Sequence, residues 1–311
     1  MTTLPPCQLT VRSFVDTDAD GVSQLFRTVY GDCYVYPDVY LPSMIRRNNA
    51  SHLWHSAVAE FGQQIVGHAV LWCDATAPDH AEFALNVVHP AARGHGIATQ
   101  LAQYLCEHAR QAGLSMLTIK EVSSHSQSQR LASKLGFQTT ALMMDYVDSP
   151  FGNKYRESIV LGCLPIKPHP IPDVAWPAAW QSWLAPMIRQ FGSGPAPVLE
   201  EVVPPLAITN TDHRCDVMLH KMCPTLVHEI ACLPADWLIY LQLALSAQTP
   251  PMMLQLQQAG FSCAGLVPGP AQRWHALMIR GHHAHELDLR CPTARALLES
   301  EQAGARETAL C

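Results

Sequence analysis

The sequence has few charged residues and no long hydrophobic run. Asp, Glu, Lys and Arg make up 15% of the 311 residues, which excludes a disordered or strongly solvated chain. The 20 Lys and Arg residues are outnumbered by 26 Asp and Glu, so no broad basic surface exists for nucleic acid or an anionic membrane. The most apolar run, 237–245, contains Gln242 and is shorter than the ~20 residues that cross a bilayer.

The first residues, MTTLPPCQLTVRSF, lack both the basic and the apolar segment of a secretory signal, so we expect a cytoplasmic protein. The sequence has 11 cysteines but no CxxC motif, which favours small core residues in a reducing compartment.

The length is about twice that of a typical domain of ~150 residues, and a proline-rich segment marks where the chain divides. The segment CLPIKPHPIPDVAWP, from Cys163 to Pro177, holds five prolines and can form neither a helix nor a strand inside a sheet. We therefore predict a first domain at 1–164, a linker at 165–177 and a second domain at 178–311.

The first domain alternates strands and helices, which predicts an α/β fold. A helix from Ile97 has apolar residues at every fourth position and ends at Gly113. The other predicted strands are 9–14, two within 56–73, 81–88, 114–122, 140–147 and 157–164, and the other predicted helices are 16–30 and 126–135.

The second domain is predicted to contain a tryptophan-rich packing helix within 174–191 and then further α/β structure. Strands are expected at 206–209, 236–245, 261–269 and 274–281, and helices at 223–233 and 249–260. The last helix, within 297–308, is polar and is expected to be exposed and partly frayed.

A glycine-rich turn lies directly between the strand 81–88 and the helix from Ile97. Gly94 and Gly96 allow successive backbone N–H groups to converge, and the helix start adds its positive dipole end. With Arg93 as a counter-charge, the turn suits a diphosphate. It is neither a Walker loop nor a dinucleotide-binding fingerprint, because GK[ST] and the third glycine are absent.

These residues resemble the GNAT N-acetyltransferase superfamily. Arg93, Gly96 and Ala98 match its Gln/Arg-x-x-Gly-x-Gly/Ala signature, and the order of elements to residue 164, including Leu-Gly-Phe at 135–137, also matches. The resemblance covers about half of the chain. It implies a GNAT-like mixed, mostly antiparallel central sheet flanked by helices. Aligning the Gly-Phe pairs at 136–137 and 260–261 indicates a second, reduced GNAT-like α/β module without the signature.

The resemblance implies an acetyl-CoA site between two splayed strands. Its pantetheine would bond to the backbone near Asn86, Val87 and Val88, and its diphosphate would lie on the amides of Arg93, Gly94, His95, Gly96, Ile97 and Ala98. The side chain of His95 is equally consistent with an exposed loop residue. The implied reaction is direct transfer of the acetyl group to an amine, which needs a base, polarisation of the carbonyl and a proton for the thiolate.

Candidate catalytic residues lie on both sides of this turn. Glu82 is the candidate base, on the expectation that strict alternation directs Glu82, Ala84 and Asn86 to one face; an inert carboxylate is equally consistent. Family members often carry a tyrosine acid where this sequence has Ala132. His125, Tyr155 and Tyr146 are alternative groups, and His125 can also be an inert loop residue. Water can also protonate the weakly basic thiolate.

The acceptor is expected over the segment 30–50. Tyr34, Tyr36 and Tyr40 are candidate substrate-binding residues because tyrosine faces attract a cationic amine; they can instead pack on the core. Arg46 and Arg47 could pair with an acceptor carboxylate. The histidines at 282–285 and the set Cys223, His228 and Cys232 match no known zinc spacing, so no metal is expected.

The leading interpretation is a cytoplasmic, acetyl-CoA-dependent N-acetyltransferase acting on a small-molecule amine. The second domain is expected to be non-catalytic, packing on the first or mediating a homodimer. The alternatives are an acyl-CoA-binding regulatory or scaffold protein, or an acyltransferase with another acyl donor or an oxygen or thiol acceptor.

Overall fold

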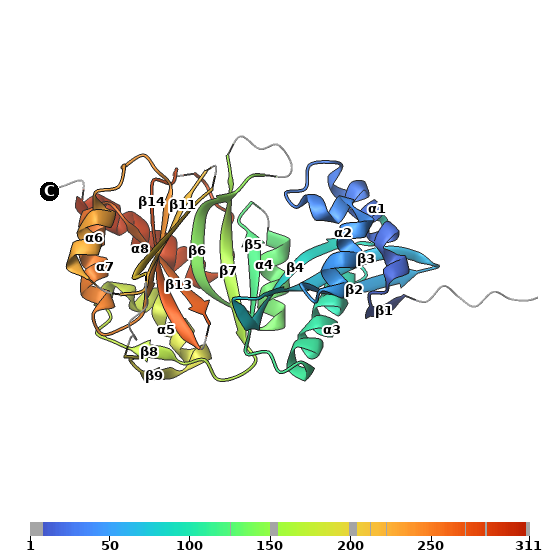
Figure 1. The fold of residues 1–311 in the computed structure, drawn as a ribbon, viewed down its shortest axis with the longest axis horizontal. Helices are drawn as coiled ribbons and strands as arrows, with labels where there is room; N and C mark the ends of the chain where they lie inside the picture. Colours follow the sequence, from blue (N-terminus) through green and yellow to red (C-terminus); the bar gives the residue numbers. More distant parts are fainter. Residues whose placement is uncertain are drawn as a thin grey trace, which may run out of the picture.

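One twelve-stranded sheet runs through the whole protein (Figure 1). The computed structural model describes residues 9–124, 126–149, 155–198, 204–211, 213–221, 223–270, 272–283 and 285–308. The strand order is β1-β2-β3-β4-β5-β7-β6-β13-β14-β12-β11-β10. No helix in these ranges is long and apolar enough to cross a membrane.

The N-terminal half has the predicted α/β succession. Its strands are β1 (Thr10–Ser13), β2 (Trp54–Phe61), β3 (Gln64–Asp74), β4 (Ala77–Val88), β5 (Met116–Val122), β6 (Gln138–Val147) and β7 (Glu157–Pro165). Its helices are α1 (Ala19–Tyr30), α2 (Pro42–Ala50), α3 (Ile97–Gln111) and α4 (Ser126–Leu135), with short turns η1 (Asp16–Asp18), η2 (Pro37–Tyr40) and η3 (Pro90–Ala92). Only β4 and β5 pair in parallel in this half, so the expected mixed, mostly antiparallel sheet is confirmed.

Helices cover both faces of the N-terminal sheet. Val22 and Phe26 of α1 pack with Val58 and Val70 on one face. On the opposite face, α3 and α4 contribute to a second core, whose strand and helix members include Phe83, Leu101, Leu105, Leu117, Ile119 and Ala132. Burial of both faces explains why the strands are rich in apolar residues on both sides.

The C-terminal half adds the rest of the sheet. Its strands are β8 (Ile171–Asp173), β9 (Ser193–Pro195), β10 (Leu206–Asn210), β11 (Cys215–Leu219), β12 (Ile239–Ala244), β13 (Ser262–Gly269) and β14 (Arg273–Arg280). Its helices are η4 (Ala178–Trp180), α5 (Gln181–Phe191), α6 (Pro224–Ala231), α7 (Thr249–Gln258) and α8 (Pro292–Thr308). The proline-rich segment 165–177 contains β8, which pairs with β9 in a separate two-stranded sheet.

The second half repeats the pairing order of the first. In the first half, the chain order β4-α3-β5-α4-β6-β7 gives the sheet order β4-β5-β7-β6. In the second half, the chain order β11-α6-β12-α7-β13-β14 gives the equivalent sheet order β11-β12-β14-β13. The two sets join where β13 pairs with β6 at Gly265 and Ala141. A Cβ on Gly265 would lie 2.2 Å from the carbonyl oxygen of Thr140, and the φ of Gly265 is +110°, so this junction requires glycine.

The tryptophan-rich helix and the last helix both pack into the C-terminal core. Trp180 and Trp183 are buried, as the apolar stripe predicted. The expectation of an exposed last helix was wrong for its first turns, because Ala294 and Leu297 of α8 are buried in the core that contains β6 and β13. The polar residues that suggested exposure follow these apolar positions in the sequence.

Candidate active site

The strands β4 and β5 separate at their C-terminal ends. They pair only from His80 to Phe83 and from Met116 to Ile119, whereas β4 continues along β3 to Val88. Each strand leads into a helix on the same face, so the gap opens at the N-terminal ends of α3 and α4. Ligands of α/β sheets bind at such carboxyl ends of parallel strands.

A bulge in β4 changes which side chains face each layer. Leu85 has a φ of +53°, and the β3–β4 register shifts between the pairs His68–Val87 and Val70–Ala84. Phe83 packs with α3, but Leu85 and Val87 pack on the α1 side. The expected strict alternation along 81–88 was therefore wrong beyond Ala84, because the extra residue reverses the order of the faces.

The predicted glycine turn has unpaired backbone donors. Gly94 and Gly96 have φ values of +85° and +73°, and Gly96 caps α3. No described residue accepts a hydrogen bond from the N–H groups of residues 94–98. The exposed Arg93 side chain makes no ion pair within the described residues, and its charge acts on the hydroxyl of Tyr30.

This turn fits the diphosphate of coenzyme A by the chemistry of its donors. Successive amides at a helix N-terminus bind anions, and Arg93 adds a permanent positive charge. The ring of His95 hydrogen-bonds with the carbonyl oxygens of Ala92 and Arg93 at 3.3 and 3.1 Å, so His95 braces the turn. On the part of β4 that is not paired with β5, the side-chain oxygen of Asn86 is buried and has no hydrogen-bond partner among the described residues.

Glu82 lies at the closed end of the gap, where β4 and β5 still pair, and its carboxylate forms an ion pair. The Lys120 ammonium on β5 donates to its Oε2 atom at 2.8 Å, and about a quarter of each side chain is exposed. Burial alone would lower the pKa of Lys120, but the Glu82 carboxylate and Tyr146 outweigh it and raise the pKa. Glu82 is thus a reachable carboxylate beside a fixed positive charge.

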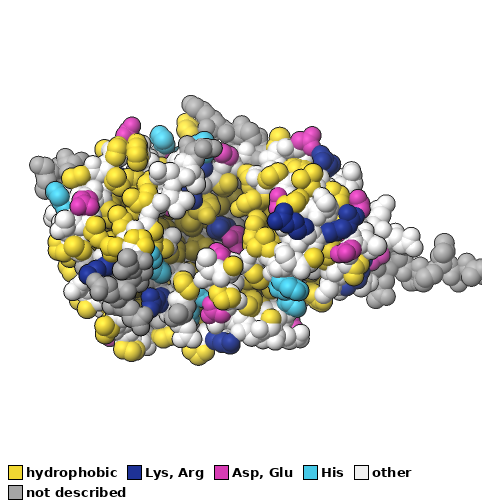
Figure 2. All heavy atoms as spheres, in the orientation of Figure 1, with side chains coloured by type: hydrophobic (Ala, Val, Ile, Leu, Met, Phe, Trp, Pro, Cys, Tyr) yellow, Lys and Arg dark blue, Asp and Glu magenta, His cyan; other side chains and the backbone are white. Residues whose placement is uncertain are grey.

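Aromatic rings surround this ion pair. Tyr36 packs against Trp72 with tilted rings whose centroids are 5.1 Å apart, and the Lys120 ammonium lies 5.3 Å from the ring centre of Tyr146. Burial raises the pKa of Tyr36, although the positive charge of Lys120 opposes that shift. Figure 2 shows that the face carrying α1 and α2 is hollowed between the two halves of the molecule, with hydrophobic side chains lining the hollow.

The three candidate acceptor tyrosines lie in different surroundings. Tyr36 is 39% exposed, and the charges of both Lys120 and Glu82 act on its hydroxyl. Tyr34 packs on Tyr30, and burial raises its pKa well above the ordinary value. Tyr40 accepts a hydrogen bond from the backbone of Tyr34 and lies under the guanidinium of Arg27. Among the candidate arginines, Arg46 pairs with Asp20 at 2.6 Å.

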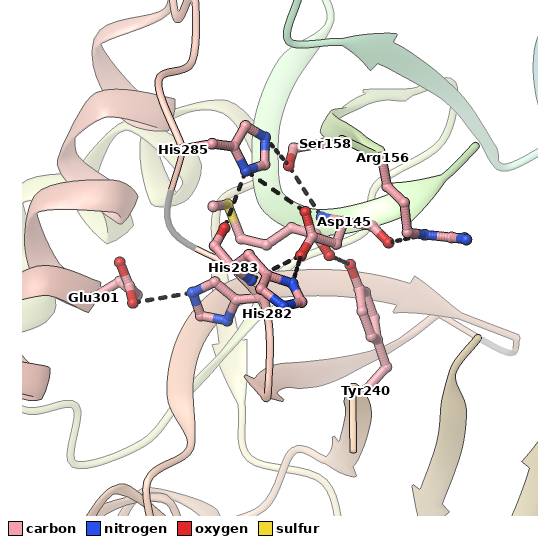
Figure 3. A network of polar contacts seen from close by, with 9 residues as sticks. Asp145, Arg156, Ser158, Tyr240, His282, His283, His285 and Glu301 are labelled. Carbon is pink, nitrogen blue, oxygen red and sulfur yellow. Dashed lines mark hydrogen bonds and ion pairs between the residues drawn. The ribbon is translucent and has the colours of Figure 1, made fainter. Parts of the chain in front are cut away.

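Tyr155 lies next to a separate polar network, which Figure 3 shows. Its ring stacks on His285, whose Nε2 atom is 3.3 Å from the hydroxyl of Ser158. Asp145 is buried with a φ of +53°, and its carboxylate accepts hydrogen bonds from the backbone and ring of His283. The candidate His125 lies outside the described residues.

The side chains of Ser158, His285 and Asp145 are arranged somewhat like a hydrolase triad, but their geometry favours a structural role. The side chain of Ser158 is fully buried, and its hydroxyl accepts a hydrogen bond from the Asp145 backbone. The His285 Nδ1 atom is closer to the carbonyl of His283 (3.0 Å) than to Asp145 (3.6 Å). The network fastens the segment after β14 to β6 and β7. Within the described ranges, no group of three or more metal-ligating side chains is arranged around an ion.

Three residues that surround the gap were not predicted as site residues. Lys120 and Glu121 follow each other on β5, and Arg214 reaches across from the C-terminal half. The Arg214 guanidinium lies 4.4 Å from the ring centre of Tyr146 and donates to its carbonyl oxygen. Charged residues at the end of an apolar strand were the signal in the sequence for Lys120 and Glu121; no local signal marks Arg214.

Comparison with known proteins identifies the domain that contains the gap. The acetyltransferase (GNAT) family model matches residues 20–137, and no curated protein matches the chain. An N-acetyltransferase from Staphylococcus aureus Mu50 is 19% identical with a TM-score of 0.45, and the match covers 51% of this chain and 99% of that chain.

Two further solved structures give matches of the same kind. YncA of Salmonella typhimurium, solved with acetyl-CoA, is 21% identical with a TM-score of 0.46, covering 53% of this chain and 98% of that one. The ribosomal-protein-S18-alanine N-acetyltransferase of Escherichia coli is 17% identical with a TM-score of 0.43, covering 51% and 95%. The family-model match assigns residues 20–137, an acyltransferase domain, to the GNAT acetyltransferase family, which uses acetyl-CoA.

Proposed function

We propose that this protein transfers the acetyl group of acetyl-CoA directly to the amine of a small molecule in the cytoplasm. The observation that carries the proposal is the row of unpaired amides at residues 94–98, at the mouth of the gap between β4 and β5. The diphosphate would lie on these amides and on Arg93, and the pantetheine along the open edge of β4 at residues 86–88. The bound acetyl-CoA supplies an activated thioester carbonyl.

The residues on the α1 and α2 side of the gap suit the acceptor. Glu82 would accept a proton from the incoming ammonium group, directly or through water, while Lys120 holds the carboxylate in place. Tyr36 and Trp72 offer ring faces to a cationic amine. Tyr155 and His125 remain predictions as proton donors.

The C-terminal half supports a small acceptor. Arg214 lies over Tyr146 and pairs with Asp216 through two hydrogen bonds of 2.7 and 3.0 Å, so a fixed side chain bounds the acceptor side. The hollow in Figure 2 is thus bordered by both halves. Such a border suits a small molecule better than the surface of a folded protein.

We further propose that the C-terminal half is a reduced copy without a coenzyme A site. Where β4 and β5 separate, β11 and β12 stay paired over all five residues of β11. Its helix α6 begins at Pro224, and no glycine lies in the turn before it. The boundaries at 164 and 178 and a homodimer remain predictions.

Thiol release from acetyl-CoA in the presence of an acceptor tests the enzymatic function. The panel comprises small primary amines, free amino acids and peptides with free N-termini. Release with small amines, and not with peptides, is expected. Release with peptides alone would contradict the small-molecule acceptor. Binding of acetyl-CoA without release in any arm would favour a regulatory acyl-CoA-binding protein, and release from longer acyl donors alone would favour another acyl chain.

A further inference from the structure

A bulge interrupts the pairing of β6 with β7. Where β6 passes through residues 144–146, β7 has only Ser158. Within the bulge, Asp145 has a φ of +53°, which is uncommon for a residue other than glycine. Bulges redirect the side chains of the strand that carries them. Here the ring centre of Tyr146 lies 5.3 Å from the Lys120 ammonium, so a residue of β6 adjoins the ion pair of the candidate site.

Side chains donate hydrogen bonds to all three backbone carbonyl oxygens of this bulge. The hydroxyl of Tyr240, in the C-terminal half, donates to the first of them at 2.5 Å. Arg156, just before β7, donates to the second and third at 2.9 and 3.2 Å. Arg214, in the C-terminal half, also donates to the third at 3.1 Å. The C-terminal half therefore helps to fix the backbone that carries Tyr146.

Arg214 is itself held in one position. Its Nε and Nη2 atoms donate to the two carboxylate oxygens of Asp216 at 2.7 and 3.0 Å. Its guanidinium carbon lies 4.4 Å from the ring centre of Tyr146 and 4.7 Å from that of Tyr240. Cations are attracted to the faces of aromatic rings. Arg214 from one half and Lys120 from the other thus interact with the same ring, that of Tyr146.

We propose that Arg214 and Tyr146 are positioning residues for the base of acetyl transfer. This inference rests on the proposed function, in which Glu82 accepts the proton of the amine. The contacts run from Arg214 to the ring of Tyr146 and from that ring to the Lys120 ammonium. Lys120 in turn donates to the Oε2 atom of Glu82 at 2.8 Å.

The position of the base matters because proton transfer needs hydrogen-bond reach. A displacement of about 1 Å in an active site can lower the rate about 100-fold. Arg214 acts through the ring and the ion pair and touches neither the thioester nor the amine. The C-terminal half thereby completes the acceptor side, although we assign it no coenzyme A site.

The test measures kcat and KM of wild type, Arg214→Met, Tyr146→Leu and Tyr146→Phe with the best acceptor of the amine panel. Arg214→Met removes the cation and Tyr146→Leu removes the ring, so kcat should fall about tenfold in each. The KM for acetyl-CoA should stay unchanged, because the turn at 94–98 is intact. Tyr146→Phe keeps the ring and should retain most of the rate. An equal loss in Tyr146→Phe and Tyr146→Leu would overturn the role of the ring.

Arg280→Met is the matched control for Arg214→Met. Arg280 also lies in the C-terminal half, with its guanidinium 4.5 Å from the ring centre of Phe261. It also donates to backbone carbonyls, but these lie within 231–259 of the same half. Arg280→Met should lower the resistance to urea and leave kcat unchanged. Equal losses of kcat in both arginine variants would mean that only the folding of the C-terminal half matters, and would overturn the inference.

A double-mutant cycle tests the path through Lys120. Lys120→Met should lower kcat, and adding Arg214→Met should cause no further loss, because the contact through which Arg214 acts is already gone. Losses that multiply in the double variant would overturn the inference and leave acetyl transfer intact. No thiol release by wild type with any acceptor would overturn both the inference and the proposed function.

Discussion

Replacing Glu121 with glutamine removes a titrating group from the core and leaves nearly the same shape. Burial raises the pKa of this carboxyl from its ordinary value of 4.5 to about 8 in the folded protein. The folded state therefore keeps the proton to a higher pH than the unfolded chain does. Rising pH then favours unfolding, and the loss of stability builds up between these two pKa values.

The size of this loss follows from the difference in proton binding. Each pH unit in which only the folded state holds the proton reduces the free energy of unfolding by about 1.4 kcal/mol. From about pH 5 to about pH 8, Glu121 should therefore reduce that free energy by about 3 kcal/mol. Glutamine does not titrate, so the variant lacks this contribution.

Urea unfolding of both proteins over this pH range measures the effect. The free energy of unfolding of wild type minus that of Glu121→Gln should become steadily more negative as pH rises. Taking the difference cancels the other titrating groups. A difference that stays constant with pH would show that Glu121 is solvated or paired, and would refute the reasoning.

Two further substitutions test the acceptor side and the junction of the halves. Glu82→Gln should lower turnover at neutral pH by about 100-fold and leave the affinity for acetyl-CoA nearly unchanged, because an amide cannot accept the amine proton; unchanged turnover would remove Glu82 from the mechanism. Gly265→Ala should reduce the free energy of unfolding by about 2–4 kcal/mol, because its Cβ would collide with Thr140. Gly192→Ala, also left-handed but with nothing within 4 Å, should cost about 1 kcal/mol; equal losses in both alanine variants would contradict the collision.

Local patterns predicted most of the fold. The four-residue spacing from Ile97 predicted α3, and the Leu-Gly-Phe turn predicted the end of α4. The strand β11 was missed, although the buried Cys215, Val217 and Leu219 alternate with the half-buried Asp216 and Met218. The pairing of β13 with β6 depends on residues that are far apart in the sequence, so no local pattern contains it.

The part of the site that the backbone forms could be predicted from the sequence. The part that depends on contacts between side chains was harder to predict. Gly94 and Gly96 are identified by residue type alone, because few other residues adopt a positive φ. The bulge at Leu85 has no such mark, so strict alternation gave the wrong face for the following residues. The ion pair of Glu82 with Lys120 and the isolation of Glu121 arise only when β4, β5 and β7 lie side by side.

Calorimetric titration with acetyl-CoA tests the central claim most directly, with wild type, Gly96→Glu and Gly192→Glu. Both glycines have a left-handed backbone, with φ values of +73° and +78°, but only Gly96 lies in the turn at residues 93–98. Gly96→Glu places a negative charge where the diphosphate would bind and should weaken binding at least about tenfold. Gly192→Glu should bind like wild type. Equal affinity in all three proteins, or binding to none of them, would contradict the account.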